Sequence, residues 1–402
     1  MKSSLLILSV LLTSALTVCA EEPNRPSKVA IPNAAGIYWQ AFSAIPDLNE
    51  QSRKSLEAAT SSTSAPLTDD LKPIVAQYRV ALHELHRARV VTPCDWQLDT
   101  DAGPELRLPH LQKARDLSRM ALLRARQRFA AGEVDAAVSD VTAVLKMGRD
   151  CGSSEILISF LVTAAIEKSA NDVLAMHLPL LNKEQLTQLE TTLKELPATC
   201  HVSSTIRAEE RLFGAWLERK IDEEVTKLNN PQAGGQLLMA IAVAAGLESD
   251  FRPDPNDKDG QRKAEFLKSL TVAEVRESLA QMHADYAEVV RISALSFDLR
   301  HSQIAALDES LTAAGKVMNR DDAKRYLSVS FMPTVRNVLL REEQYLVRRQ
   351  LLEQAIRVQR DGADSLQPIF ERKVEYQKTK AGFELRCRCG NESETIKVGN
   401  AS

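Results

Sequence analysis

The feature that most constrains this chain is a run of three helical patterns between residues 108 and 179. In the first, 108–131, apolar side chains return every three or four residues, which places them on one face of a helix. Gly132 follows, and glycine readily takes the left-handed conformation that ends many helices. The second pattern, 133–148, has a similar apolar stripe, so the two helices are expected to bury their stripes as an antiparallel hairpin. The polar residues of the second pattern fall on its opposite face: Asp135, Ser139, Asp140 and Lys146.

The third pattern, 154–179, is apolar on all sides from Ile156 to Ile166, which is typical of a helix inside a protein. It is too short to span a membrane, and it contains Glu167 and Lys168. We therefore predict an interior helix against which the hairpin packs. The predicted fold is all-α, an irregular array of antiparallel helical hairpins with a small C-terminal β-hairpin.

The hairpin is similar to one tetratricopeptide repeat. The turn glycine, the small residue after it and two apolar residues of the second helix match that motif: Gly132, Ala137, Val141 and Leu145. Arg124 and Ala125 stand near the places where the motif has a large aromatic residue and a glycine. We find no second copy at a fixed period, whereas tetratricopeptide arrays repeat the unit.

Composition restricts the class of protein and of partner. The 402 residues are 44% hydrophobic and 26% charged, which is ordinary for a globular protein with a sizeable core. Aromatic residues make up only 5%, which favours helix over sheet. The 51 basic and 54 acidic residues give a net charge of −3, which argues against nucleic acid as a partner.

The first twenty residues have the pattern of an export signal. Lys2 precedes an apolar core at 5–16, and Val18-Cys19-Ala20 is typical of a cleavage site. A membrane anchor is one alternative, and lipoprotein processing at Cys19 is another, because 16–19 resembles a lipobox. We expect an exported protein, periplasmic or extracellular, with no transmembrane span after residue 20. Residues 21–32 are polar and are expected to form a flexible leader.

We assign 33–371 to the helical domain and 372–402 to the β-hairpin tail, with a sub-boundary expected in loop 249–263, which is rich in charge and proline. Further helices are predicted over 34–45, 69–91, 204–228, 236–247 and 334–360. Asn182 with Gln185 and Thr271 with Glu274 have the spacing of capping boxes.

Two later patterns have a different period. Apolar residues from Val272 to Val289 alternate steps of three and four, which predicts a short coiled-coil seam with 304–311 as its antiparallel return. The residues of 374–378 and 383–387 alternate around a turn at Lys380-Ala381-Gly382, which indicates a β-hairpin, and 394–398 is a candidate third strand.

Two stretches resemble many exported bacterial helical proteins that have no known activity. One contains Cys94, Trp96, Gly103, Leu108-Pro109-His110-Leu111, Arg115 and Arg124-Ala125. The other runs from Asp361 through Pro368 and Phe370 to Gly382-Phe383-Glu384-Leu385. The resemblance implies an exported helical protein and implies no chemistry.

Histidines near a cysteine form the first candidate site. His83 and His86 are three residues apart, whereas the zinc helix of metalloproteases has its histidines four apart on one face. Cys94 and His110 would complete a set of metal ligands if the intervening loop folds back. Solvated or structural histidines are the simpler explanation.

Acidic residues and cysteines give two weaker candidates. Asp95, Asp99 and Asp101 flank Trp96, as carboxylates do in sugar-cleaving sites, although turns favour aspartate in any case.

Cys387 and Cys389 would face the same side of a strand, as a redox or metal pair or as two small buried residues. If cleavage follows Ala20, five cysteines remain. At least one of them is then unpaired, and Cys94 has either Cys151 or Cys200 as a candidate partner.

The first helix of the hairpin is strongly basic: Arg107, Lys113, Arg115, Arg119, Arg124, Arg126 and Arg128. These residues would suit an anionic envelope polymer or an acidic protein. They would equally suit an acidic helix of the chain itself, and Glu209, Glu210, Glu218, Asp222, Glu223 and Glu224 provide one.

Motifs for phosphate loops, serine-hydrolase elbows, dinucleotides and calcium loops are absent from the sequence. We therefore assign no catalytic, cofactor-binding or metal-binding residue and predict no cofactor. The predicted function is a non-catalytic extracytoplasmic helical scaffold or protein-binding module. The alternatives are an envelope hydrolase or metal-dependent enzyme with its site in the 83–110 region, and a lipid-anchored structural protein.

Overall fold

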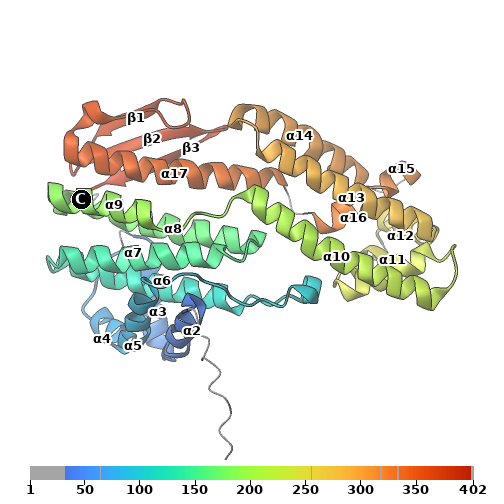
Figure 1. The fold of residues 1–402 in the computed structure, drawn as a ribbon, viewed down its shortest axis with the longest axis horizontal. Coiled ribbons are helices and arrows are strands. Elements are labelled where there is room, and N and C mark those ends of the chain that lie inside the picture. The colour runs from blue at the N-terminus through green and yellow to red at the C-terminus, as the bar shows by residue number, and fades with distance from the viewer. Residues whose placement is uncertain (1–31, 64, 255, 317–318, 333–334, 400–402) are drawn as a thin grey trace, which may run out of the picture.

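The computed structural model describes residues 32–399, except 64, 255, 317–318 and 333–334. It is mostly helical, with a small three-stranded antiparallel sheet near the C-terminus. Figure 1 shows the N-terminal helices and the sheet at one end of an elongated molecule and helices α10–α16 at the other. The predicted export signal lies outside the described residues, as does nearly all of the predicted leader.

The N-terminal end is built from helices that follow one another in layers (Figure 1). Their bounds are α2 Ala34–Ser43, α3 Glu50–Thr60, α4 Leu71–Gln77, α5 Arg79–Ala88, η1 Thr100–Glu105, α6 Pro109–Ala130, α7 Val134–Gly152, α8 Leu157–His177, η2 Leu178–Leu180 and α9 Lys183–Glu195. The helix predicted over 69–91 is wrong as a single element, because the chain turns at Tyr78 between α4 and α5.

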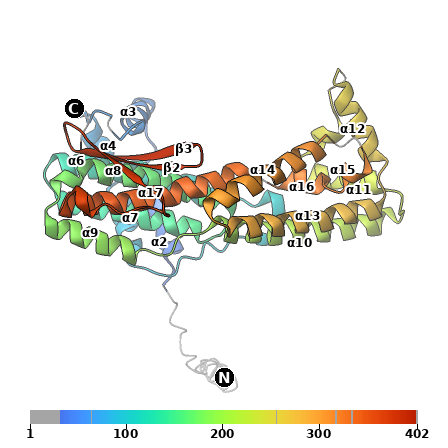
Figure 2. The ribbon, with the colours of Figure 1, turned by 90° about the horizontal axis from the view of Figure 1, so that it is seen from above.

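The other end contains α10 Val202–Leu228, α11 Gly234–Ala244, η3 Glu248–Phe251, α12 Lys258–Lys268, α13 Val272–Ser293, α14 Phe297–Ala314, α15 Arg320–Ala323 and α16 Tyr326–Phe331. Helix α13 packs chiefly along α10, as Figures 1 and 2 show, so the predicted pairing of its seam with α14 is wrong as the main contact. Both capping boxes are present, at Asn182 with Gln185 and at Thr271 with Glu274.

The chain then returns through α17 Val335–Asp361 and η4 Ala363–Ser365 to the sheet. Strands β1 Val374–Lys378, β2 Phe383–Cys389 and β3 Glu392–Val398 pair antiparallel in the order β1-β2-β3. Val374 lies opposite Cys387, and Phe383 lies opposite Val398. The predicted hairpin is therefore two strands of a three-stranded sheet that packs on α17.

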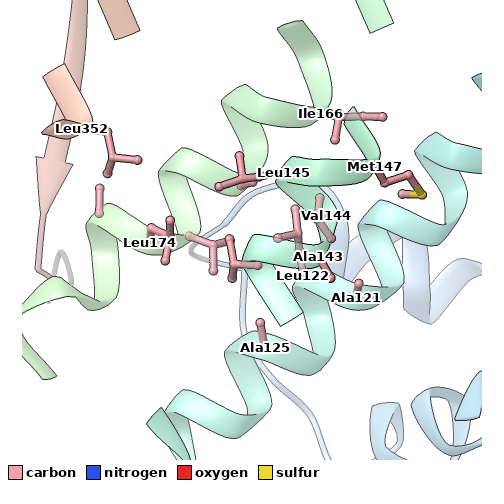
Figure 3. Packing of buried hydrophobic residues seen from close by; sticks show 14 of the residues in the cluster. Ala121, Leu122, Ala125, Ala143, Val144, Leu145, Met147, Ile166, Leu174 and Leu352 are labelled. Atoms are coloured by element: carbon pink, nitrogen blue, oxygen red, sulfur yellow. The ribbon is translucent and has the colours of Figure 1, made fainter. Parts of the chain in front are cut away.

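Helices α6, α7 and α8 pack in succession, and Figure 3 shows side chains of all three, among them Ala121, Val144 and Ile166. Helix α7 has the largest buried share of the three. Every residue of α7 from Asp140 to Gly152 is buried. Gly148 permits this contact, because a Cβ there would lie 3.1 Å from the Ile166 side chain of α8. On the polar face that the sequence pattern gives to α7, Asp140 and Lys146 are therefore buried, whereas Ser139 is half-buried and Asp135 is exposed.

Helix α8 is less enclosed than its composition predicts. Phe160 and Ile166 are buried, but Ile158 is 47% exposed and Ala165 also faces solvent. The prediction of an interior helix is therefore wrong for this stripe of α8 and correct for the rest of it.

The buried side chains form two hydrophobic clusters, which we call core 1 and core 2. Core 1 lies among α2–α9, the second half of α17 and the sheet, and core 2 lies among α10–α16 and the first half of α17. Helix α8 gives Phe160 to core 2 and Ile166 to core 1, and α17 gives Tyr345 and Leu351 in the same way. The loop expected at 249–263 is wrong in part, because 249–251 belong to η3 and 258–263 form the start of α12. Helices α11 and α12 on either side both contribute to core 2. None of the described helices is both long and apolar enough to cross a membrane.

Candidate functional site

A groove of about 690 Å³ runs along α7 between the end of α5 and helix α9. Helix α7 forms its floor with a valine, two hydroxyl residues and a lysine, and α9 forms a wall rich in amide and hydroxyl groups. We call it the α7 groove; its lining is Arg89, Val90, Thr92, Asp135, Val138, Ser139, Thr142, Lys146, Gln185, Gln188, Leu189, Thr192, Glu195, Leu196 and Pro197. Its mixed polar lining is suited to a ligand that offers hydrogen-bonding groups.

The α9 wall is tied to the α7 floor by Gln185, a residue of the α9 capping box. The Gln185 side chain accepts from the Asn182 backbone N–H and donates to Asp135 Oδ1 of α7 at 2.7 Å. Leu189 on the same helix is buried in core 1, which fixes the distance between the walls. The groove is therefore shaped by packed helices rather than by a loop.

A cluster of charges stands directly behind the floor. The fully buried Asp140 carboxylate accepts from Arg124 Nε at 3.0 Å, from Arg128 Nη1 at 2.8 Å and from His86 Nε2 at 2.7 Å. Burial raises the pKa of Asp140, but the hydrogen bonds from His86 and Arg124 and the two arginine charges outweigh it and leave the pKa below its ordinary value. Two arginines therefore share one buried carboxylate, and Arg128 Nε also lies 3.9 Å from Glu133 Oε2.

Ser139 connects this cluster to the groove. His86 Nε2 lies 2.7 Å from Asp140 Oδ1 and 3.1 Å from Arg124 Nη2, and its Nδ1 lies 3.5 Å from Ser139 Oγ. Arg89 Nη1 donates to the same Oγ at 3.0 Å and lies 3.4 Å from Thr142 Oγ1. The order of serine, histidine and aspartate is that of a hydrolase relay, but the serine oxygen already accepts from a guanidinium.

A second buried carboxylate, Asp150, lies at the other end of the floor. Lys146 forms an ion pair with it, and the Tyr38 hydroxyl donates to its Oδ2 at 2.6 Å. The Trp96 indole donates to its backbone carbonyl at 2.7 Å. Burial raises the pKa of Asp150 in spite of the lysine, so this pair serves chiefly to tie α2 and the 92–104 loop to α7.

The structure does not bring the predicted metal ligands together. His83 is exposed, and His86 is engaged with Asp140. His110 is buried and stacks on Trp96 with ring centroids 4.3 Å apart, and burial lowers its pKa to about 4. Cys94 lies near Asp150, and burial raises the pKa of its thiol to about 12. Within the described residues, no three histidine, cysteine or acidic side chains gather as a metal site would require.

The weaker candidates have structural roles in this geometry. Asp95 and Asp99 accept backbone N–H groups in turns, at Gln97 and Asp101 respectively. Trp96 is buried against aromatic rings and offers no face to a sugar. Cys387 and Cys389 face the same side of β2 and are buried, and all five cysteines of the described chain are free thiols.

The expected pairing of the basic helix with the acidic one is wrong. Arg124 and Arg128 of α6 bind Asp140, and Arg126 donates to the backbone carbonyl of Ala59. On α10, Glu224 pairs with two lysines of its own helix, and Glu210 faces His283 of α13. Among the described residues, no ion pair joins α6 to α10.

Sequence reasoning singled out His86 but missed Ser139, Asp140 and Arg89 as its neighbours. They come from α5 and α7, about fifty residues apart in the chain, and no local motif joins them. The one available signal was Asp140, an aspartate beside the apolar stripe of a helix whose preceding partner carries several arginines. No protein-family model matches the chain, and neither a curated protein nor a solved structure does so.

Proposed function

We propose that this protein is a non-catalytic extracytoplasmic scaffold of helical hairpins whose α7 groove binds an acidic segment of a protein partner. The observation that carries this proposal is Arg89. Its guanidinium lies in the groove against two hydroxyl groups, and no carboxylate of the described residues lies within ion-pair distance of it. A guanidinium held at a half-buried position is suited to a carboxylate brought by a ligand.

The polar groups across the groove suit an extended segment. The Gln188 amide lines the groove, and the Thr192 hydroxyl, which donates to the Gln188 carbonyl at 3.0 Å, is left with an acceptor for a backbone N–H. The carboxylates of the lining, Asp135 and Glu195, lie on the α7 and α9 sides, so Arg89 marks the end of the groove where an acidic side chain would bind.

The test is capture of partners from an envelope extract by the purified mature protein. We expect Thr192→Trp, which fills the groove, and Arg89→Glu, which reverses its charge, to lose the partners that the unaltered protein retains. Thr191→Trp and Arg87→Glu are matched controls, because Thr191 does not line the groove and Arg87 pairs with Glu84 on the exposed side of α5. Equal recovery by groove variants and controls would refute the proposal.

The extracytoplasmic location rests on the sequence of residues 1–20 and is tested separately. Mass spectrometry of the mature N-terminus distinguishes cleavage after Ala20 from a lipid-modified Cys19. An intact Met1 in protein isolated from its native host would contradict both routes.

A hydrolase is the second candidate, and the relay of Ser139, His86 and Asp140 is the observation that favours it. It ranks below the scaffold because Ser139 lies inside α7, where the backbone N–H groups are used by the helix and do not form an oxyanion hole. A fluorophosphonate probe decides between them: labelling that is lost in Ser139→Ala and in His86→Ala would favour the hydrolase.

A further inference from the structure

A second cavity, independent of the α7 groove, lies where α8 and α17 run side by side near β3. Its volume is about 240 Å³. The floor is apolar and consists of Leu161, Ala164 and Ala165 of α8 and the ring of Tyr345. It continues along α8 toward Ile158, which is 47% exposed, so the uncovered stripe of this helix leads into the cavity.

The polar side chains around the cavity are unequally satisfied. Arg348 pairs with Asp172 and Glu394, and Gln344 donates to Glu392 Oε2 at 2.7 Å. The exposed Arg341 donates only to the Gln344 amide oxygen, at 2.9 Å, and no carboxylate of the described residues lies within ion-pair distance of it. One end of an apolar groove therefore carries a cation without a counter-charge.

Lys168 is a third cation of the cavity lining, beside Arg341 and Arg348, and its ammonium has a carboxylate partner. Its ammonium lies 3.6 Å from Asp172 Oδ2, on a carboxylate that it shares with Arg348. Burial and, second, the charge of Arg348 lower the pKa of Lys168. Its aliphatic stem extends the apolar wall, while Arg341 remains the cation that is free to receive an anion.

We propose that this groove binds an amphipathic carboxylate with a single aliphatic chain, such as a medium-chain fatty acid. The chain lies along Leu161 and Ala165, and the carboxylate meets Arg341. The cavity is smaller than the pockets of about 300–1,000 Å³ that hold drug-sized ligands, so it accepts one short chain and excludes a two-chain lipid. Charge selects the head group, and the apolar floor selects the tail.

The experiment is a calorimetric titration of the purified protein with hexanoate, octanoate and decanoate, each below its aggregation concentration. Because each buried methylene is worth roughly fourfold in affinity, every two-carbon step is expected to tighten Kd by about fifteenfold until the cavity is full. Decylamine, with the opposite charge, is expected to bind at least tenfold more weakly than decanoate.

Two pairs of variants locate the ligand. Ala165→Trp fills the groove and is expected to abolish decanoate binding, whereas Ser169→Trp, at an exposed position of α8 outside the cavity, leaves it unchanged. Arg341→Gln weakens binding about tenfold, and Lys168→Gln changes it less than threefold. Thermal unfolding of each variant without ligand verifies that it is folded.

Three results would overturn the proposal. One is equal affinity for decanoate and decylamine, which would indicate an apolar surface without an anion-binding site. Another is undiminished binding by Ala165→Trp. The third is no decanoate binding by the unaltered protein. A concentration-dependent dimer that Ile158→Glu dissolves would then show that a second copy of the chain covers the stripe.

Discussion

In core 1 the buried Asp140 carboxylate faces three basic side chains, whereas at the edge of core 2 the Glu209 carboxylate, 7% exposed, faces a single backbone N–H. Glu209 of α10 accepts from Leu157 N at 3.1 Å and so caps the first turn of α8. Burial raises its pKa to about 7, while that of Asp140 is lowered. Equal burial thus gives opposite titration, because the partners differ.

The difference in partners keeps Asp140 ionised over a wider pH range, whereas Glu209 titrates near neutral pH. The ionised form of Asp140 is favoured by the fold, so its stabilising effect is present above the ordinary aspartate pKa and is lost as the pH falls through its lowered folded value. For Glu209 the neutral form is favoured, so its stabilising effect is complete at low pH and is lost as the pH rises toward 7. The two predictions below test this contrast, and a third tests its cause.

The largest effect is expected at Asp140. Asp140→Ala leaves Arg124 and Arg128 without their counter-charge in a mostly buried setting, and we expect a loss of about 4 kcal/mol in the free energy of unfolding. Urea unfolding at pH 7 measures it. Asp116→Ala, which breaks the more exposed pair with Arg119 on the same helix α6, is the control and costs less than about 1 kcal/mol. Similar losses in both variants would break the comparison.

The next effect is the pH dependence at Glu209. Between the ordinary value of 4.5 and about 7, the unaltered protein is expected to lose roughly 3 kcal/mol through this group as the pH rises. Glu209→Gln keeps an acceptor for Leu157 N and removes the titration, so it is the more stable protein above pH 7. Glu223→Gln, an exposed glutamate of the same helix, retains the unaltered profile. Unfolding curves from pH 4.5 to 8 that coincide for Glu209→Gln and the unaltered protein would contradict this assignment.

The smallest effect is expected at two buried histidines that pack against core 1. They test whether a hydrogen-bond partner decides the stability of a buried polar side chain. Both ring nitrogens of His110 are buried without a hydrogen bond among the described residues, so His110→Phe keeps the stack on Trp96 and stabilises the protein by about 1 kcal/mol. His177 also stacks on a ring, that of Phe129, but its Nδ1 bonds the Val173 carbonyl at 2.8 Å. His177→Phe therefore costs about 1 kcal/mol, measured by urea unfolding. Changes of the same sign would refute the explanation by partners.

The sequence was sufficient for the parts of the fold that local rules determine. The spacing of apolar residues located α6, α7 and α8 to within a few residues, and pairs three residues apart located the caps at Asn182 and Thr271. The alternating C-terminal segments likewise became strands of the sheet.

Local sequence rules did not predict which polar side chains of a helix are buried. Asp140 and Lys146 lie on the polar face of α7, and pattern alone places that face in solvent; arginines, a histidine and another carboxylate from elsewhere in the fold make it an interior face. The same reason hid the contacts of Ser139 and Arg89. On α8 an apolar side chain that was predicted to be buried is exposed, because an apolar pattern does not show that no neighbour covers Ile158.

The two shared helices bear on how the chain can be divided. Helices α8 and α17 both contribute side chains to core 1 and to core 2. If the chain were cut in 249–263, the N-terminal fragment would keep α8 and lose α17, and the C-terminal fragment would keep α17 and lose α8. Neither fragment would then retain a finished interior. The molecule is therefore expected to unfold in a single step as one folding unit, despite the segment rich in charge and proline at 249–263.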